Sequence, residues 1–164
     1  MKKLLIYTDG SHLKHTSGRL GIGGVLVDAM TNTMLAKFSE EIDLEYMKTH
    51  YGTTDVSNPT CEMLANLWAL RQFKDWLTGG DTEVCMKADF IGVQNFNTGV
   101  WRTKAPYIKT IKEETQKEVL AQGLKDRIHY EWVKGHQTKA AIMADKDAYW
   151  NAVVDGLSKG EKKK

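Results

Sequence analysis

The feature that most constrains the fold is a change of pattern after residue 41. Three strand-like runs come first, at 3–8, 20–27 and 34–41. Polar, turn-forming links join them (Thr16-Ser17-Gly18 and Thr31-Asn32), so we predict three antiparallel strands in a meander. Helical and strand-like segments alternate after this point. Strands followed by such alternation predict an α/β domain built on a mixed sheet.

The second part of the sequence supplies the alternating elements. Apolar periodicity and turn residues predict helices at 59–77, 91–97, 104–122 and 147–158, and strands at 83–88 and 128–133. We expect 43–56, which has no firm period, to be a loop. The length fits one domain over residues 1–160, followed by a short basic tail at 161–164.

Composition narrows the class of protein. The 41% hydrophobic and 27% charged residues are typical of a globular domain, and no apolar run approaches the roughly 20 residues that span a membrane. Residues 1–7 fit a strand and not a signal peptide. Cys61 and Cys85 form no disulfide or metal-ligand pattern, so we expect a reducing, cytoplasmic setting. Nothing in the sequence suggests more than a monomer. The net charge of +2 neither requires nor excludes nucleic acid.

Glu62 stands out in the first long helix. Asn58 is a favourable N-cap, and Pro59 suits the first helical position. At about 100° per residue, Glu62 falls on the apolar side of this helix, so its carboxylate is expected to point toward the sheet. Two interpretations stay open. The side chain could complement the helix dipole, or it could be buried and require a partner such as a metal ion.

Two aspartates end predicted strands. Asp9 could form a turn with Gly10, and Asp89 could be the N-cap of the next helix. Ligands, however, bind at strand ends in open α/β sheets. If the first and fourth strands are parallel neighbours, Asp9 and Asp89 leave one sheet edge side by side, and Glu62 reaches it from the connecting helix. Carboxylates gathered there would repel one another unless cations lay between them.

The chemistry of such a site follows from its ligands. Oxygen-only ligands suit Mg²⁺ or Mn²⁺ and not Zn²⁺. Two such ions about 3.5–4 Å apart can clamp both the attacking and the leaving oxygen of a phosphodiester. The pattern therefore predicts phosphodiester hydrolysis with two Mg²⁺ ions, for which Mn²⁺ could substitute.

Five short motifs follow one another along nearly the whole chain. They are Tyr7-Thr8-Asp9-Gly10-Ser11; Asn58, four positions before Glu62; Ala88-Asp89, with Asn95 six positions later; Trp132-Val133-Lys134-Gly135-His136; and Asn151 with Asp155, Leu157 and Ser158. Each is weak alone, but in this order they resemble the type 1 ribonuclease H family. The resemblance implies the ribonuclease H-like fold, in which three antiparallel strands and then two parallel strands form a sheet with helices on both faces.

The resemblance also implies an activity and a set of metal ligands. The family cleaves the RNA strand of RNA–DNA hybrids and leaves 5′-phosphate and 3′-hydroxyl ends. Asp9 would bridge both metal ions, and Glu62 and Asp89 would bind the ion next to the leaving oxygen. Asp155 would help to bind the ion that activates water, and His136 would assist proton transfer or product release.

The resemblance assigns substrate contacts to a second group of residues. Gly10, Ser11, Asn58 and Asn95 would contact the RNA strand and its 2′-hydroxyls, the groups that distinguish RNA from DNA. In the loop at 99–106, Trp101, Arg102 and Lys104 are candidates for contacting the DNA strand. The alternative is that Trp101 packs into the core of a capped loop.

The sequence departs from the family pattern at several positions. Phe90 stands where the family usually has serine, and Pro59 replaces the second asparagine of a common pair, which puts polar substrate contacts in question. The interval from His136 to Asp155 is also longer than usual. Asp145 is therefore a rival for the fourth carboxylate, although the spacing from Asn151 favours Asp155.

Two other functions compete with ribonuclease H. A nuclease of the same superfold could act on DNA, and a non-catalytic domain could bind duplexes without cutting them. The histidine loop and Asn58 favour a ribonuclease H, and a non-catalytic domain would ordinarily lack at least one of the carboxylates.

Overall fold

The fold is built on one twisted sheet, seen in a computed structural model that describes residues 2–13, 19–78, 81–135 and 137–160. The strands are β1 (Lys3–Leu13), β2 (Arg19–Asp28), β3 (Thr33–Ile42), β4 (Glu83–Ala88) and β5 (Ile128–Trp132), in the order β3-β2-β1-β4-β5. The first three strands pair antiparallel, and β1, β4 and β5 run parallel. The predicted α/β mixed sheet is therefore confirmed, while the expected turn at Thr16-Ser17-Gly18 lies outside the described residues.

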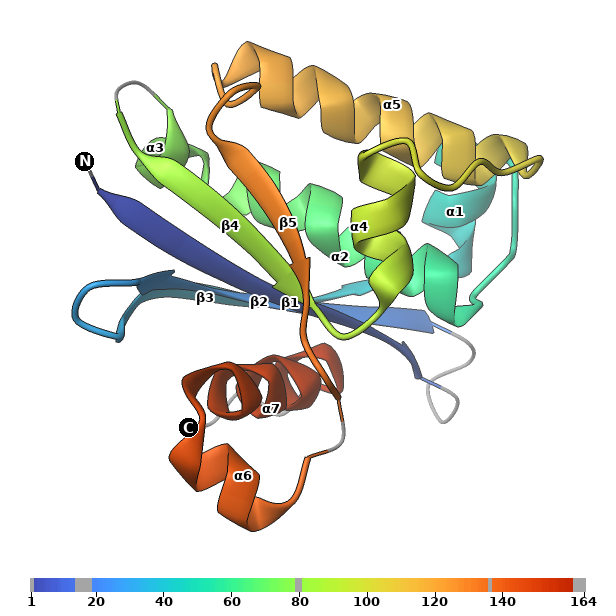
Figure 1. Ribbon diagram of the computed structural model, residues 1–164. Helices are drawn as coiled ribbons and strands as arrows, with labels where there is room; N and C mark the ends of the chain where they lie inside the picture. Colours follow the sequence, from blue (N-terminus) through green and yellow to red (C-terminus); the bar gives the residue numbers. More distant parts are fainter. Residues whose placement is uncertain (1, 14–18, 79–80, 136, 161–164) are drawn as a thin grey trace.

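Helices cover both faces of this sheet (Figure 1). The helices are α1 (Leu44–Tyr51), α2 (Asn58–Gln72), α3 (Lys74–Leu77), α4 (Ile91–Asn97), α5 (Pro106–Ala121), α6 (Lys139–Ala144) and α7 (Lys146–Ser158). Figure 1 shows α1, α2, α4 and α5 on one face, and α6 and α7 on the other. Within the described part of the chain, no helix is long and apolar enough to cross a membrane.

Two hydrophobic clusters hold the layers together. The larger cluster joins α2 to the sheet, and the smaller one joins α7 to it. The smaller cluster consists of Leu5, Tyr7, Val25, Val27, Cys85, Trp150, Val154 and Leu157. α2 is buried on almost every side because it lies between the sheet and α5, which is why its sequence is apolar nearly all round.

The long helix predicted at 59–77 is shorter than expected. α2 ends at Gln72, and the short α3 follows after Phe73, so Trp76 leaves the apolar face and is 43% exposed. The predicted N-cap was also wrong. Ser57 occupies that position and Asn58 is the first helical residue, so Pro59 is the second helical residue, one position later than predicted.

Two helices were not predicted. The expected loop at 43–56 contains α1, which Asp43 caps by accepting a hydrogen bond from the Tyr46 backbone and which Gly52 ends with φ of 66°. α6 occupies the long interval before α7 and has no buried residue, so no apolar periodicity marked it. At the other end of the chain, the fifth strand and α5 match their predicted positions to within two residues.

Candidate metal centre

Asp9 and Asp89 are placed side by side by the pairing of their strands. Thr8 of β1 is in register with Ala88 of β4, and the two strands are parallel. The residue that follows each partner is therefore an aspartate: Asp89 comes directly after β4, whereas Asp9 lies within β1, which continues to Leu13 instead of ending at residue 8 as predicted. Asp9 is 4% exposed, and Asp89 is half-buried. This confirms the parallel arrangement on which their predicted convergence depends.

Glu62 reaches the same edge from α2. The helix can approach β1 because Gly10 has no side chain: a Cβ there would lie 2.4 Å from the Cys61 carbonyl carbon and oxygen. Glu62 is only 2% exposed, as its position on the apolar side of the helix predicted. It faces the sheet, and the Gly10 backbone N–H donates a hydrogen bond to its carboxylate.

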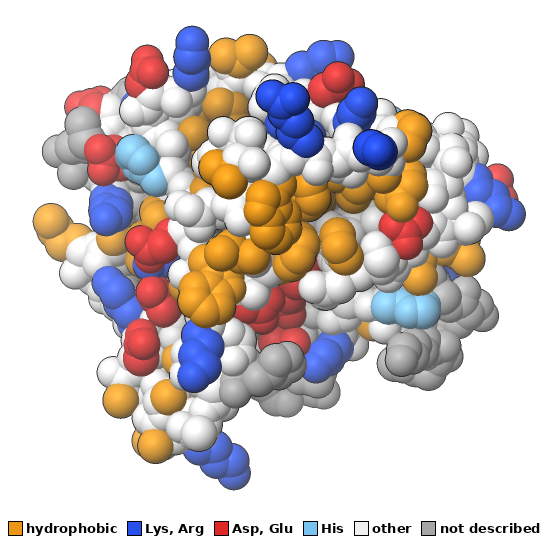
Figure 2. All heavy atoms as spheres, turned by 45° about the vertical axis from the view of Figure 1, so that its right-hand side comes forward, with side chains coloured by type: hydrophobic (Ala, Val, Ile, Leu, Met, Phe, Trp, Pro, Cys, Tyr) orange, Lys and Arg blue, Asp and Glu red, His pale blue; other side chains and the backbone are white. Residues whose placement is uncertain are grey.

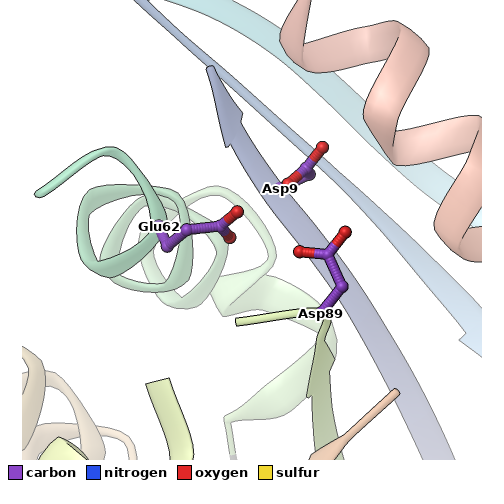
Figure 3. Close-up of side chains that lie close together, drawn as sticks. All are labelled: Asp9, Glu62 and Asp89. Atoms are coloured by element: carbon purple, nitrogen blue, oxygen red, sulfur yellow. The ribbon is translucent and has the colours of Figure 1, made fainter. Parts of the chain in front are cut away.

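The three carboxylates converge (Figure 3). One oxygen from each of Asp9, Glu62 and Asp89 lies within 4.8 Å of the others. Burial, together with the charge of Asp89 and the contact with Asp155, raises the pKa of Asp9 to about 7. Burial and the neighbouring charges of Asp9 and Asp89 raise the pKa of Glu62 well above its usual range. The carboxylates are thus destabilised as anions unless a cation joins them.

A divalent cation fits this set of ligands. Oε1 of Glu62 is buried and has no hydrogen-bond partner among the described residues. An unpartnered carboxylate oxygen in an acidic cluster is costly, and coordination to a cation would satisfy it. Hard oxygen ligands of this kind match Mg²⁺ or Mn²⁺.

The fourth predicted carboxylate, Asp155, comes from α7 on the other face of the sheet. It is half-buried, contacts Asp9, and accepts a hydrogen bond of 3.0 Å from the Lys159 ammonium group. Its rival, Asp145, is exposed and caps α7 by accepting a hydrogen bond of 2.8 Å from the Asp147 backbone. The extra length before α7 therefore forms α6 and this cap, and Asp155 is the one that lies beside the cluster.

Other residues of α7 also touch the aspartates. Asn151 donates a hydrogen bond of 3.3 Å to Asp89, and the Ser158 hydroxyl donates one of 3.4 Å to Asp9. Ser158 also pairs with the Ser11 hydroxyl at 2.7 Å. A cavity of about 210 Å³ lies next to this side of the site, and its lining includes Asp89, Asn151 and Asp155.

Two further contacts with Asp89 were not predicted from the sequence. The Trp132 indole donates a hydrogen bond of 3.0 Å to the Asp89 backbone carbonyl, which joins the end of β5 to the site. A Cβ on Gly135 would lie 2.8 Å from the Asp89 carboxylate, so only glycine fits there without displacement. Both residues belong to the motif that begins at the last residue of β5, but neither contact leaves a periodic signal in the sequence.

The predicted substrate-binding residues lie on three elements, β1, α2 and α4. Asn58 is exposed at the start of α2, and Asn95 is half-buried on α4, which packs against α2. Ser11 is half-buried on β1, and Gly10 presents its backbone beside Glu62. His136 lies outside the described residues.

Hydrophobic and acidic side chains lie next to each other on one face of the molecule. Figure 2 shows a band of hydrophobic side chains directly beside the acidic side chains at the centre of this face. Trp101 is 39% exposed and packs edge-on against Phe96 and Phe90, with ring centroids 5.5 and 6.5 Å apart. Phe90, which replaces the family's usual serine, thus packs partly inside. Arg102 and Lys104 are exposed in the same loop.

Known proteins were compared with the sequence and with the fold. The RNase H family model matches residues 1–158. No curated protein sequence matches the chain.

Several solved structures share the fold. The RNase H1 of the halophilic archaeon Halobacterium salinarum superposes with a TM-score of 0.69 and 18% identity, over 97% of this chain and 96% of that one. The N-terminal RNase H domain of a Mycobacterium tuberculosis protein superposes with a TM-score of 0.63 and 23% identity, over 98% of this chain and 99% of that one. LC11-RNase H1, a compost metagenome protein, was solved in complex with an RNA/DNA hybrid. That structure superposes with a TM-score of 0.66 and 20% identity, over 93% of this chain and 94% of that one.

Proposed function

Since the chain belongs to the RNase H family and is a ribonuclease H, we propose that it hydrolyses the RNA strand of RNA–DNA hybrids by a two-metal-ion mechanism. The products would be 5′-phosphate and 3′-hydroxyl ends. The observation that carries the proposal is the convergence of Asp9, Glu62 and Asp89 within 4.8 Å. The complex of LC11-RNase H1 with an RNA/DNA hybrid supports the choice of substrate.

The proposed metal ligands divide between the two faces of the sheet. Asp9, Glu62 and Asp89 would hold one Mg²⁺ ion, and Asp9 with Asp155 would hold the second. Bound divalent cations supply charge stabilisation at the scissile phosphate and acidify a bound water. The protein's own part is to keep these carboxylates together and ionised, which the raised pKa values of Asp9 and Glu62 make difficult without a cation.

The substrate would lie across the acidic edge of the sheet. Ser11, Asn58 and Asn95, with the Gly10 backbone, would contact the RNA strand and its 2′-hydroxyls. Trp101 keeps an exposed part of its ring beside the exposed Arg102 and Lys104, an arrangement that would suit the sugar and phosphates of the DNA strand. His136 would assist proton transfer or product release, because an imidazole ordinarily titrates at about pH 6.5.

The whole chain would serve this activity. Residues 1–160 would form the catalytic domain, with 161–164, outside the described residues, as a basic tail. We propose that the protein acts in the cytoplasm, since both cysteines are free and buried, and that it acts as a monomer.

A substrate panel tests the function. The protein is incubated with Mg²⁺ and an RNA–DNA hybrid, double-stranded RNA or double-stranded DNA, and the ends of the products are mapped. The expected result is cleavage of the RNA strand of the hybrid alone, with 5′-phosphate ends and full inhibition by EDTA. Cleavage of the DNA duplex would indicate a DNA-directed nuclease instead. Binding of the hybrid without cleavage would indicate a non-catalytic domain.

A further inference from the structure

A group of charged side chains lies between the sheet and the start of α7. We call it the Lys87 cluster; it consists of Lys87 on β4, Asp147 on α7, Glu131 on β5 and Tyr7 on β1. The Lys87 ammonium group lies 2.9 and 3.1 Å from the two Asp147 carboxylate oxygens and 2.7 Å from Glu131. The Tyr7 hydroxyl also donates a hydrogen bond to Asp147, and Lys87 lies over the Tyr7 ring.

The Lys87 cluster is unusual because its lysine is buried. Lys87 is only 8% exposed, and it lies beside the smaller hydrophobic cluster that joins α7 to the sheet. A buried ion pair contributes little net stability compared with hydrophobic residues of similar size, but it specifies one geometry. An ammonium group offers three donors, which matches the two oxygens of Asp147 and one of Glu131. The cluster therefore fixes where the start of α7 lies.

Its position relates it to the metal centre. Tyr7 precedes Asp9 by two residues on β1, and Lys87 precedes Asp89 by two residues along the chain. Side chains two residues apart on a strand share one face, so Tyr7 and Asp9 both face α7. The same two strands thus position Asp9 and Asp89 and carry two of the groups that hold α7.

The other end of α7 is held differently. A Cβ on Gly21 would lie 1.8 Å from the Ser158 carbonyl oxygen, and one on Gly23 would lie 2.7 Å from the Leu157 Cβ. The Ser39 hydroxyl donates a hydrogen bond of 2.6 Å to the Leu157 carbonyl. Close backbone packing therefore fixes the end of α7, and a charged cluster fixes its start.

Asn151 and Asp155, which reach the aspartates of the metal centre, lie between these two attachments. We propose that Lys87 is a positioning residue: through Asp147 it holds the first half of α7 where Asn151 and Asp155 meet Asp89 and Asp9, and so it strengthens cation binding. This inference rests on the proposed metal-dependent function. The pKa of Asp147 is lowered, because the hydrogen bonds from Tyr7 and Lys87 outweigh the opposing effect of burial, which is consistent with a charged pair.

The test measures cation binding without substrate. Mn²⁺ is titrated calorimetrically into the wild-type protein and into Lys87→Met, Lys87→Arg and Asp147→Asn, each first checked for folding by circular dichroism. Loss of a group that orients a metal ligand lowers metal affinity by roughly 10–100-fold. We expect a loss of about 10-fold for Lys87→Met, because Lys87 acts on the metal ligand indirectly, through Asp147 and α7. Asp147→Asn should lose less, and Lys87→Arg should restore most of the affinity. Hydrogen exchange should show faster exchange in the first half of α7.

Arg71→Met is the matched control. The Arg71 guanidinium pairs with Glu118 at 3.3 Å and lies over the Trp68 ring, so it joins α2 to α5 away from α7. The Arg71→Met substitution should lower the melting temperature but leave the Mn²⁺ affinity and the hydrogen exchange of α7 unchanged. If Lys87→Met does not fold, Tyr7→Phe, which removes only the hydroxyl, together with Asp147→Asn decides the question.

The outcomes separate this inference from the proposed function. If the wild-type protein binds Mn²⁺ and cleaves the hybrid, but the folded variants of the Lys87 cluster bind Mn²⁺ with unchanged affinity, the inference alone is overturned. An equal loss of affinity in Arg71→Met would also overturn it, because the effect would then be general destabilisation. Failure of the wild-type protein to bind Mn²⁺ or Mg²⁺ would overturn both.

Discussion

The two faces of the sheet hold the metal centre in different ways. On the α2 face, a large hydrophobic cluster fixes the helix that carries Glu62, and the helix is buried on almost every side. On the α7 face, the hydrophobic cluster is small, and polar contacts such as those of Lys87, Asn151 and Ser158 connect the helix to the sheet. Glu62 is therefore fixed by packing, whereas Asp155 depends on directional contacts.

These two kinds of attachment should tolerate change differently. A carboxylate fixed by a packed core is held even when a cation is absent, at the cost of a raised pKa. A carboxylate on a helix attached by hydrogen bonds can shift by small amounts when one contact is lost. Substitutions on the α2 face should therefore mainly lower stability, whereas substitutions on the α7 face should mainly displace the side chains that α7 directs toward the metal centre.

The largest expected effect comes from the shared edge of the sheet. Asp89→Asn keeps the size of the side chain but removes a charge from the three-carboxylate cluster. We expect hybrid cleavage to fall by more than about 100-fold, beyond the roughly 10–100-fold that follows loss of a group that orients a metal ligand. The rate is measured with Mg²⁺ on a labelled hybrid, and circular dichroism verifies the fold. Activity equal to that of the wild-type protein would remove Asp89 from the site.

The same leucine substitution on each face compares the packing directly. Leu67 is fully buried in the larger cluster, and Leu157 is 4% exposed in the smaller one. Leu→Ala changes in cores cost about 2–5 kcal/mol of unfolding free energy, and we expect Leu67→Ala near the upper end and Leu157→Ala near the lower. Urea denaturation measures both. A larger loss for Leu157→Ala would reverse the comparison between the faces.

Substitutions of Asp155 and Asp145, the two candidates for the fourth carboxylate, should have different effects on cleavage and on stability. Asp155→Asn should lower the cleavage rate by about 10–100-fold with little change in stability, because it acts through the metal centre. Asp145→Asn should leave the rate nearly unchanged. Asp145→Ala, which removes the helix cap, should cost about 1 kcal/mol of unfolding free energy. The opposite pattern, with activity lost only at position 145, would make Asp145 the fourth carboxylate.

The stability of the metal-free protein, measured in EDTA, should depend on pH. The folded pKa of Asp9, about 7, is above its unfolded value, so the folded protein binds more protons between about pH 4 and pH 7. The free energy of unfolding should therefore fall as the pH rises through that window; Asp9 alone contributes up to about 1.4 kcal/mol for each pH unit, and the raised pKa of Glu62 acts in the same direction. Melting temperatures measure it. Asp9→Asn should show a weaker decline, and saturating Mg²⁺ should reduce the decline in the wild-type protein; a rise in metal-free stability over this range would contradict the raised pKa.

The α2 side of the site could be predicted from the sequence. Asp9 and Asp89 each follow a strongly apolar run, and parallel pairing of the strands that contain those runs was enough to bring them together, although β1 continues beyond Asp9. Glu62 was marked by its place on an apolar helix face, and it is 2% exposed. Local patterns carried all three because each side chain is positioned by the element on which it lies.

The α7 side could not be predicted to the same depth. The Lys87–Asp147 contact joins residues 60 positions apart, and no periodicity encodes such a pair. The interval before α7 was interpreted by length alone because α6 buries no residue. α1 was missed for a different reason: its cap at Asp43 and its end at Gly52 were present in the sequence, but only Met47 and Tyr51 are buried, which is too few for a clear period.

Anomalous diffraction from crystals soaked in Mn²⁺ would test the metal centre most directly. We predict a peak whose ligands are oxygens of Asp9, Glu62 and Asp89, and, with a bound hybrid, a second peak about 3.5–4 Å away that contacts Asp9 and Asp155. The first peak should disappear in Asp89→Asn crystals. Crystals saturated with Mn²⁺ that show no peak among these three carboxylates would contradict the assignment of this edge of the sheet as the catalytic site.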